Sequence, residues 1–293
     1  GIVAISLHLL TAAPKPQKVG MVKTSFLKEI SGLAVSRTHD NTLWAVNDSG
    51  NRARLYAIEA NGNLLGYYKV GAQNFDWEDM GSFIKNGQSW LMIADVGDNK
   101  ARRDNLRLLF FPEPQNVPHL QTTPTLDPFI IPFRYDDGPR DCEAVCVSDD
   151  ATRVYFLSKR DQPPRLYQLN LKWPLLEQAD LKTAKFIGAL ENIPAPSAQD
   201  LKEEYGKYRS QPTSMDMIDN KLIVLTYKHA YHYCVENIGR NRIKIPAPFV
   251  YELPSQKSLP QREALAISKI HNGFYVTSER ENAGIYWVDF RDK

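Results

Sequence analysis

The chain has 293 residues, and its 36 basic and 34 acidic side chains leave a formal net charge of +2. A charge so close to neutral excludes a protein whose overall field is directed at nucleic acid or at a membrane surface. Aromatic residues make up 11% of the chain, beside 19 Pro and 16 Gly. This mixture favours many short strands separated by turns over long amphipathic helices.

Residues 1–13 are apolar, end in small residues and are followed by Pro14. The pattern is typical of the tail of a secretory signal peptide without its basic start. A short buried strand or a frayed terminus is the alternative. No later stretch approaches the ~18 consecutive apolar residues of a spanning helix. The sequence therefore predicts an exported protein, periplasmic or secreted, with no membrane span.

Five short segments align without gaps, at positions 31–36, 78–83, 143–148, 213–218 and 263–268. Each begins with an oxygen-bearing side chain and carries Leu, Val or Met two residues later. The second position is small in four copies, as expected where strands crowd around an axis. These small residues are Gly32, Ala144, Ser214 and Ala264.

Two further strand-like runs follow each segment, and a fourth run follows in the first four copies. Four consecutive antiparallel strands at such a period are the signature of propeller blades. The fifth copy lacks its outer strand, and residues 19–26 are the natural replacement. We therefore predict an all-β fold, a five-bladed β-propeller of four-stranded blades closed by the N-terminal strand, as a single domain over residues 17–293. A six-bladed propeller is the alternative. A helix-like insertion at 197–208 is expected over one face.

The first residues of the five segments are expected to converge at one mouth of the central channel. Three of them are carboxylates, Glu78, Glu143 and Glu263. The position two residues earlier is also polar in every copy, with Glu29, Asp76, Asp141, Gln211 and Gln261. Close carboxylates repel each other by ~1 kcal/mol or more per pair even in water, so this mouth needs cations.

Two sources of positive charge are visible. Basic side chains follow the second strands, and these candidates for binding an anionic ligand are Lys159, Arg160, Lys228 and Arg280. A metal is the other source, because Asp48, Asp76, Asp95 and Asp98 are hard oxygen ligands suited to Ca²⁺ or Mg²⁺. A structural ring of ion pairs, a functional metal or acid/base site, and solvated loop ends all remain open.

Signatures of other chemistry are absent from the sequence. There is no Gly-x-Ser-x-Gly motif and no phosphate-cradling glycine loop. The three cysteines, Cys142, Cys146 and Cys234, lack zinc spacing. Cys142 and Cys146 would lie about 13 Å apart on one strand, too far to form a disulfide with each other. Buried free thiols are expected.

Several motifs together resemble a family of uncharacterised bacterial exported propeller proteins. They are Ser31-Gly-Leu-Ala34, Asn47-Asp-Ser-Gly50, Asp76-Trp-Glu-Asp79 and Ala94-Asp-Val-Gly-Asp-Asn99, with Asp141-Cys-Glu-Ala144 and Arg262-Glu-Ala-Leu265. The chain is more distantly similar to the phytase-like and SdiA-regulated propellers, in which an acidic residue also opens the inner strand. The resemblance implies an extracytoplasmic propeller and, for some relatives, calcium-dependent phosphoester chemistry. It transfers no catalytic residue to this chain.

Two functions follow as hypotheses. The first is a binding scaffold that presents a small-molecule or protein ligand site on its top face, without nucleic acid. The second is a Ca²⁺-type hydrolase of a phosphoester, lactone or sugar-like ligand, with Glu78, Glu143 and Glu263 as metal ligands or general acid/base. In the second, Asp95 and Asp98 add oxygen ligands. The first is preferred slightly, because one fold hosts many functions.

Overall fold

The computed structural model describes residues 13–119, 124–176, 179–235 and 246–290. These ranges contain twenty-one β-strands and two short 3-10 helices. The predicted signal segment, apart from its last residue, lies outside the described residues. Within them, no helix combines the length and the apolar composition needed to cross a membrane. The fold is therefore all-β, as the composition predicts.

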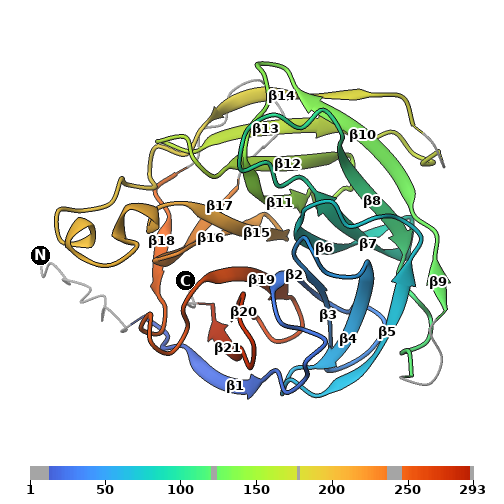
Figure 1. Ribbon diagram of the computed structural model, residues 1–293, viewed down its shortest axis with the longest axis horizontal. Coiled ribbons are helices and arrows are strands. Elements are labelled where there is room, and N and C mark those ends of the chain that lie inside the picture. The colour runs from blue at the N-terminus through green and yellow to red at the C-terminus, as the bar shows by residue number, and fades with distance from the viewer. Residues whose placement is uncertain (1–12, 120–123, 177–178, 236–245, 291–293) are drawn as a thin grey trace, which may run out of the picture.

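The strands form five antiparallel meanders, each starting at a central strand and stepping outward (Figure 1). The first comprises β2 (Ile30–Val35), β3 (Thr42–Asn47), β4 (Arg54–Glu59) and β5 (Leu64–Val70). The second comprises β6 (Trp77–Lys85), β7 (Gln88–Asp95), β8 (Leu106–Pro112) and β10 (Phe129–Tyr135). The third comprises β11 (Cys142–Val147), β12 (Arg153–Ser158), β13 (Arg165–Asn170) and β14 (Lys182–Ala189). The fourth comprises β15 (Pro212–Ile218), β16 (Lys221–Thr226), β17 (His229–Cys234) and β18 (Phe249–Glu252), and the fifth β19 (Arg262–Ser268), β20 (Gly273–Ser278), β21 (Gly284–Asp289) and β1 (Gln17–Met21).

The central strands contact one another in a closed ring, from β2 through β6, β11, β15 and β19 back to β2. Five separate apolar clusters fill the wedges between neighbouring sheets. Because every sheet packs on both faces, the two strands nearest the centre are buried along most of their length, and strict apolar–polar alternation is missing from them. The arrangement is propeller-like. All three cysteines are free thiols, and Cys142 and Cys146 are buried, as the spacing predicts.

The two ends of the described chain meet in one sheet, where β1 pairs antiparallel with β21. A strand was predicted over residues 19–26, whereas β1 begins at Gln17 and already ends at Met21. From Val22 the chain leaves the sheet, and the side chains of Val22 and Leu27 are fully buried in the wedge between the fifth and first sheets. Burial of these two anchors stabilises a turn where the pattern suggested a longer strand.

Parallel pairs also join the outer edges of the first three sheets. β10 pairs with β14, which merges the second and third meanders into one eight-stranded sheet. The short β9 (Thr125–Leu126), which precedes β10, pairs with β5 of the first sheet. The segment from β9 to β10 thus bridges three sheets and covers strand edges that would otherwise be open.

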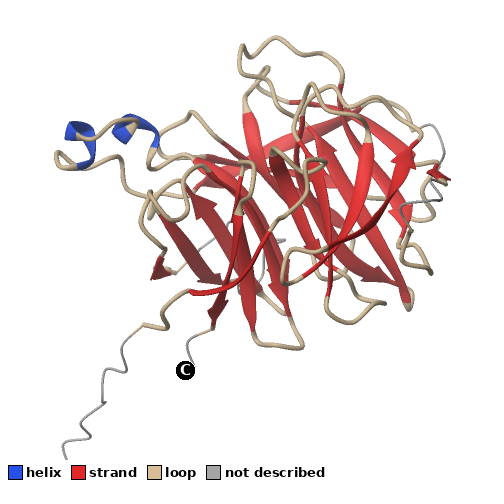
Figure 2. Cartoon of the chain, turned by 60° about the horizontal axis from the view of Figure 1, so that its bottom comes forward, coloured by secondary structure: helices blue, strands red, loops and turns tan. Residues whose placement is uncertain are grey.

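The insertion before β15 projects from one face of the sheets (Figure 2). It contains η1 (Asp200–Lys202) and η2 (Gly206–Tyr208), two single 3-10 turns where the sequence suggested a helix. Asp200 fixes its base, because this carboxylate accepts hydrogen bonds from Ser197 and pairs with Lys228 at 2.9 Å.

Candidate functional site: an acidic mouth beside a polar pocket

Every central strand carries a β-bulge at its beginning. The pairing register shifts at Ser31, Glu78, Glu143, Thr213 and Glu263, the first residues of the five aligned segments. A bulge leaves one residue out of the ladder and re-aims its side chain. The repeated column found in the sequence is therefore a repeated backbone device that turns one polar side chain per sheet.

Two members of the column are structural. Ser31 Oγ donates a 2.6 Å hydrogen bond to the carbonyl of Trp77, and Thr213 Oγ1 donates one of the same length to the carbonyl of Arg262. Each bond links a central strand to the next central strand in the ring. The charge of the column is therefore left to its three glutamates.

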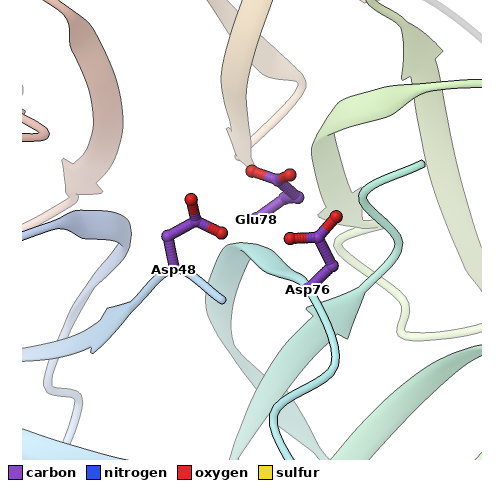
Figure 3. A group of neighbouring side chains, drawn as sticks. All are labelled: Asp48, Asp76 and Glu78. Carbon is purple, nitrogen blue, oxygen red and sulfur yellow. The ribbon is translucent and has the colours of Figure 1, made fainter. Parts of the chain in front are cut away.

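Asp48, Asp76 and Glu78 bring carboxylate oxygens within 4.8 Å of one another (Figure 3). Asp48 follows β3, Asp76 precedes β6, and Glu78 is the bulge residue of β6. Burial, together with repulsion from Asp76, raises the pKa of Asp48 to about 7. Burial also raises the pKa of Glu78 well above its usual range, and Glu143 is the strongest of the neighbouring charges that add to this effect. We call Asp48, Asp76, Glu78 and Glu143 the acidic mouth.

Glu143 is only 5% exposed and uses its two oxygens differently. Oε1 accepts a hydrogen bond from Lys159 Nζ, whereas Oε2 has no hydrogen-bond partner among the described residues. Burial raises the pKa of Glu143 to about 8, although Lys159 lowers it. An unpartnered buried carboxylate oxygen is costly, so a donor or a cation at this point would stabilise the site.

A short chain of hydrogen bonds connects Glu143 to Glu263. Lys159 Nζ donates to Tyr227 Oη at 3.1 Å, and that hydroxyl donates to Glu263 Oε1 at 2.5 Å. Burial raises the pKa of Glu263 well above its usual range, and a hydrogen bond with Glu279 raises it further. Lys159 and Tyr227 thus link two of the three glutamates of the column, Glu143 and Glu263.

Gly97 makes room for the carboxylates. A Cβ at this position would lie 2.2 Å from Glu78 Oε1 and 2.5 Å from Asp76 Oδ2. Such separations are far below any allowed contact, so only glycine permits both carboxylates to occupy this place. The glycine of the Asp95-Val-Gly-Asp98 motif therefore belongs to the site.

The two aspartates of that motif have other partners. Asp95 is fully buried and forms ion pairs with Arg103 at 2.8 Å and Arg107 at 3.0 Å. Asp98 accepts hydrogen bonds from the backbone N–H groups of Arg102 and Arg103, both at 2.9 Å. The structure does not place either carboxylate in the group formed by Asp48, Asp76 and Glu78.

The predicted basic residues are divided between two places. Lys159, Arg160 and Arg280 line a pocket of about 830 Å³. Arg160 also pairs with Asp141 at 2.7 Å. Lys228 instead holds the base of the insertion through Asp200. The rest of the lining comes from the insertion, the end of β16 and the segments before β15 and β19: Glu203, Glu204, Tyr205, Tyr208, Arg209, Gln211, Tyr227, Gln256, Pro260 and Gln261. Gln211 and Gln261 belong to the polar column seen in the sequence, and the others were not singled out there.

The sequence also did not reveal the role of Asp79. It occupies the second position of the aligned segments, where the other copies have small residues, and it is completely buried. Its carboxylate accepts hydrogen bonds from Val145 N, Met215 N and Ser214 Oγ on two other central strands, and from Met80 N. It therefore ties β6 to β11 and β15 across the ring.

Comparison with known proteins does not assign the chain to a family. No protein-family model matches the chain, and no curated protein matches it in sequence. The solved structures that resemble it include a luciferin-regenerating enzyme, at 12% identity and a TM-score of 0.49 over 94% of this chain and 95% of that one. A protein of unknown function from Bacteroides thetaiotaomicron is 11% identical, with a TM-score of 0.45 over 94% and 76% of the two chains. A chain of a nidogen/laminin complex is 10% identical, with a TM-score of 0.42 over 86% and 73%. The family suggested by the sequence motifs stays a prediction.

Proposed function

We propose that this chain is a five-bladed β-propeller, a single domain over residues 17–293, that works as a binding protein. Its acidic mouth holds a hard divalent cation of the Ca²⁺ type, and the neighbouring pocket receives the ligand. The five meanders and the closed ring of central strands support the blade number. Polar residues from several sheets line this one pocket, which supports a ligand-binding site. Binding is preferred slightly over catalysis because one fold hosts many functions.

One observation carries the cation proposal. Glu143 Oε2 is buried and has no hydrogen-bond partner among the described residues, and Glu143 acts electrostatically on Glu78, one of three carboxylates with oxygens within 4.8 Å of one another. Among the described residues, the ammonium group of Lys159 is the one ion-pair partner of Glu143, and it is bound to the other oxygen of that residue. A divalent cation would supply the missing positive charge and a partner for the free oxygen.

The donor set determines which cation fits. Asp48, Asp76, Glu78 and Glu143 offer only carboxylate oxygens, without a thiolate or an imidazole. Hard cations such as Ca²⁺ and Mg²⁺ prefer such ligands, whereas zinc favours nitrogen and sulfur. Ca²⁺ accepts six to eight oxygens in flexible geometry, which suits carboxylates from three separate segments.

Calorimetric titration of chelator-treated protein with Ca²⁺ and Mg²⁺, paired with thermal unfolding, tests the proposal. A cation at about 100 times its dissociation constant should stabilise the fold by about 2.7 kcal/mol. Asp76→Asn should weaken binding by at least ~10-fold, because it removes a charged ligand. Glu191→Gln, a change at an exposed carboxylate outside the site, should leave it unchanged. Absence of both binding heat and a midpoint shift with either cation would refute the proposal.

Hydrolysis is the second candidate, favoured by the hydrogen-bonded chain from Glu143 through Lys159 and Tyr227 to Glu263. Two members of this hydrogen-bonded chain, Lys159 and Tyr227, line the pocket. A bound ligand would therefore contact groups that can donate and accept protons. Wild-type protein and Glu143→Gln should be screened with phosphoesters, lactones and glycosides in the presence of Ca²⁺. Turnover lost in the folded variant would favour an enzyme, and no turnover by the wild type would leave the binding function alone.

The prediction of export rests on the apolar residues 1–13. Fractionation of the source cells should place the protein in the periplasm or the medium, with this segment removed. Recovery from the cytoplasm with the segment intact would contradict it.

A further inference from the structure

We infer that the pocket beside the acidic mouth binds an oxyanion, carried by a small molecule with an aromatic or otherwise flat body, and that the cation strengthens this binding. The inference rests on the proposed function, since it identifies the class of ligand for the same site. Arg280 holds the oxyanion, and Tyr205 supplies a flat surface for the rest of the molecule.

Arg280 is the free cationic group of the pocket. Lys159, Arg160 and Arg209 also line it, but each is already bound to a carboxylate, on Glu143, Asp141 and Glu203 respectively. The exposed Arg280 guanidinium has no hydrogen-bond or ion-pair partner among the described residues. A guanidinium presents a planar fork of N–H donors that matches a carboxylate or a phosphate.

The insertion contributes aromatic side chains to the lining of the pocket. Tyr205 is 71% exposed and lines the pocket together with Tyr208. Asp200 pairs with Lys228 and so attaches the start of the segment to the fourth sheet, and Glu203 pairs with Arg209 within the segment. A large side chain so exposed at the edge of a polar pocket gains contact area when a flat ligand covers it.

The pocket residues that contact the buried glutamates explain why a cation in the acidic mouth affects ligand binding. Lys159 and Tyr227 line the pocket and bond directly to Glu143 and Glu263, so the carboxylates of the mouth lie next to the ligand. Their negative charge would repel an anion at Arg280. A divalent cation in the mouth would reduce this repulsion, so the two ligands should bind cooperatively, and each should raise the affinity of the other by the same factor.

Phenylphosphonate and benzoate are suitable probes, because neither contains an ester bond that the protein could hydrolyse. Methylphosphonate and acetate lack the flat body, and benzyl alcohol lacks the charge. Calorimetry with and without saturating Ca²⁺ should show phenylphosphonate or benzoate bound at least ~5-fold more tightly with the cation. Benzyl alcohol should bind at least ~10-fold more weakly than the matching anion.

Variants separate the two contacts. Arg280→Gln should weaken binding of the anionic probes by at least ~10-fold, whereas Arg102→Gln, at an exposed arginine outside the pocket, should not change it. Tyr205→Ala should remove the advantage of phenylphosphonate over methylphosphonate. Both altered residues are exposed, and circular dichroism checks that the variants are folded.

The inference is overturned if Arg280→Gln binds the anionic probes as tightly as the wild type, or if benzyl alcohol binds as tightly as they do. Ca²⁺ binding without any binding of the probes also overturns it and leaves the proposed cation site intact. Failure of Ca²⁺ itself to bind is seen directly in the cation titration, and it removes the proposed function as well as the cooperative site.

Discussion

Asp79 permits the sharpest test of how the sheets are held around the centre. Its Oδ2 accepts hydrogen bonds from the backbone N–H groups of Val145 and Met215 at 2.9 and 3.1 Å. Its Oδ1 accepts one from the backbone N–H of Met80 at 2.9 Å and one from the Ser214 hydroxyl at 3.0 Å. Asp79→Ala leaves three buried N–H groups without an acceptor. At about 1–3 kcal/mol for each, the loss is about 3–9 kcal/mol, a large part of the 5–15 kcal/mol typical of a domain.

Asp79→Asn should be far less harmful. The amide oxygen can keep the two N–H groups now bound to Oδ2, and the hydroxyl of Ser214 can turn to accept a hydrogen bond from the amide nitrogen. Only the N–H of Met80 is then left unpaired, so the cost is about 1–3 kcal/mol. Burial raises the pKa of Asp79 well above its usual range, so replacing the acid by a neutral amide also removes the cost of burying a charge.

Urea unfolding followed by circular dichroism measures both variants. Asp104→Ala, at an exposed aspartate, serves as the control and should stay within about 0.5 kcal/mol of the wild type. The reasoning is wrong if Asp79→Ala is as stable as this control, or if Asp79→Asn is less stable than Asp79→Ala.

Three further predictions concern pH, space and charge. Burial raises the pKa of Asp216 to about 6, above its value in the unfolded chain. The stability that this carboxyl contributes, about 3 kcal/mol, is therefore complete below pH ~4 and is lost as the pH rises through 6. Relative to Asp216→Asn, the wild type should become less stable to urea between about pH 4 and 7, and parallel stability curves would contradict this. Gly97→Ala should weaken Ca²⁺ binding ~10–100-fold in calorimetry by displacing the carboxylate of Glu78, and unchanged affinity would exclude these carboxylates as ligands. Lys159→Met should destabilise the protein by about 3 kcal/mol or more, because it leaves the buried Glu143 without its ion-pair partner. Adding Glu143→Gln should restore most of the loss in the thermal unfolding midpoint, and no recovery would mean that Lys159 stabilises the protein through packing.

Much of the fold is encoded locally, and the sequence was therefore informative. The second and third runs of every copy coincide with β3, β7, β12, β16 and β20 and with β4, β8, β13, β17 and β21. Apolar runs of strand length and turn residues act over a few neighbours, so one copy can be compared with the next. The N-terminal strand was misplaced because the burial of Val22 and Leu27 depends on a wedge between two sheets, which a local pattern does not contain.

The candidate site was only partly predictable. The column containing Glu78 and Glu143 was visible because each copy has an oxygen-bearing side chain at the position of its bulge. Asp48 and Asp76, two of the predicted oxygen ligands, lie close together with Glu78. Asp95 was grouped with them in the prediction because the arginines that neutralise it, Arg103 and Arg107, follow only in the next loop and strand.

The sequence by itself determined that the chain forms repeated four-stranded units and which polar side chain begins each of them, because these properties depend on contacts between neighbours along the chain. Only the tertiary structure decided which carboxylates meet, which are neutralised by arginine and which oxygen of Glu143 finds no hydrogen-bond partner in the described part of the chain. Charges interact through space, and residues as far apart in sequence as Asp79 and Ser214 become neighbours only when the ring closes.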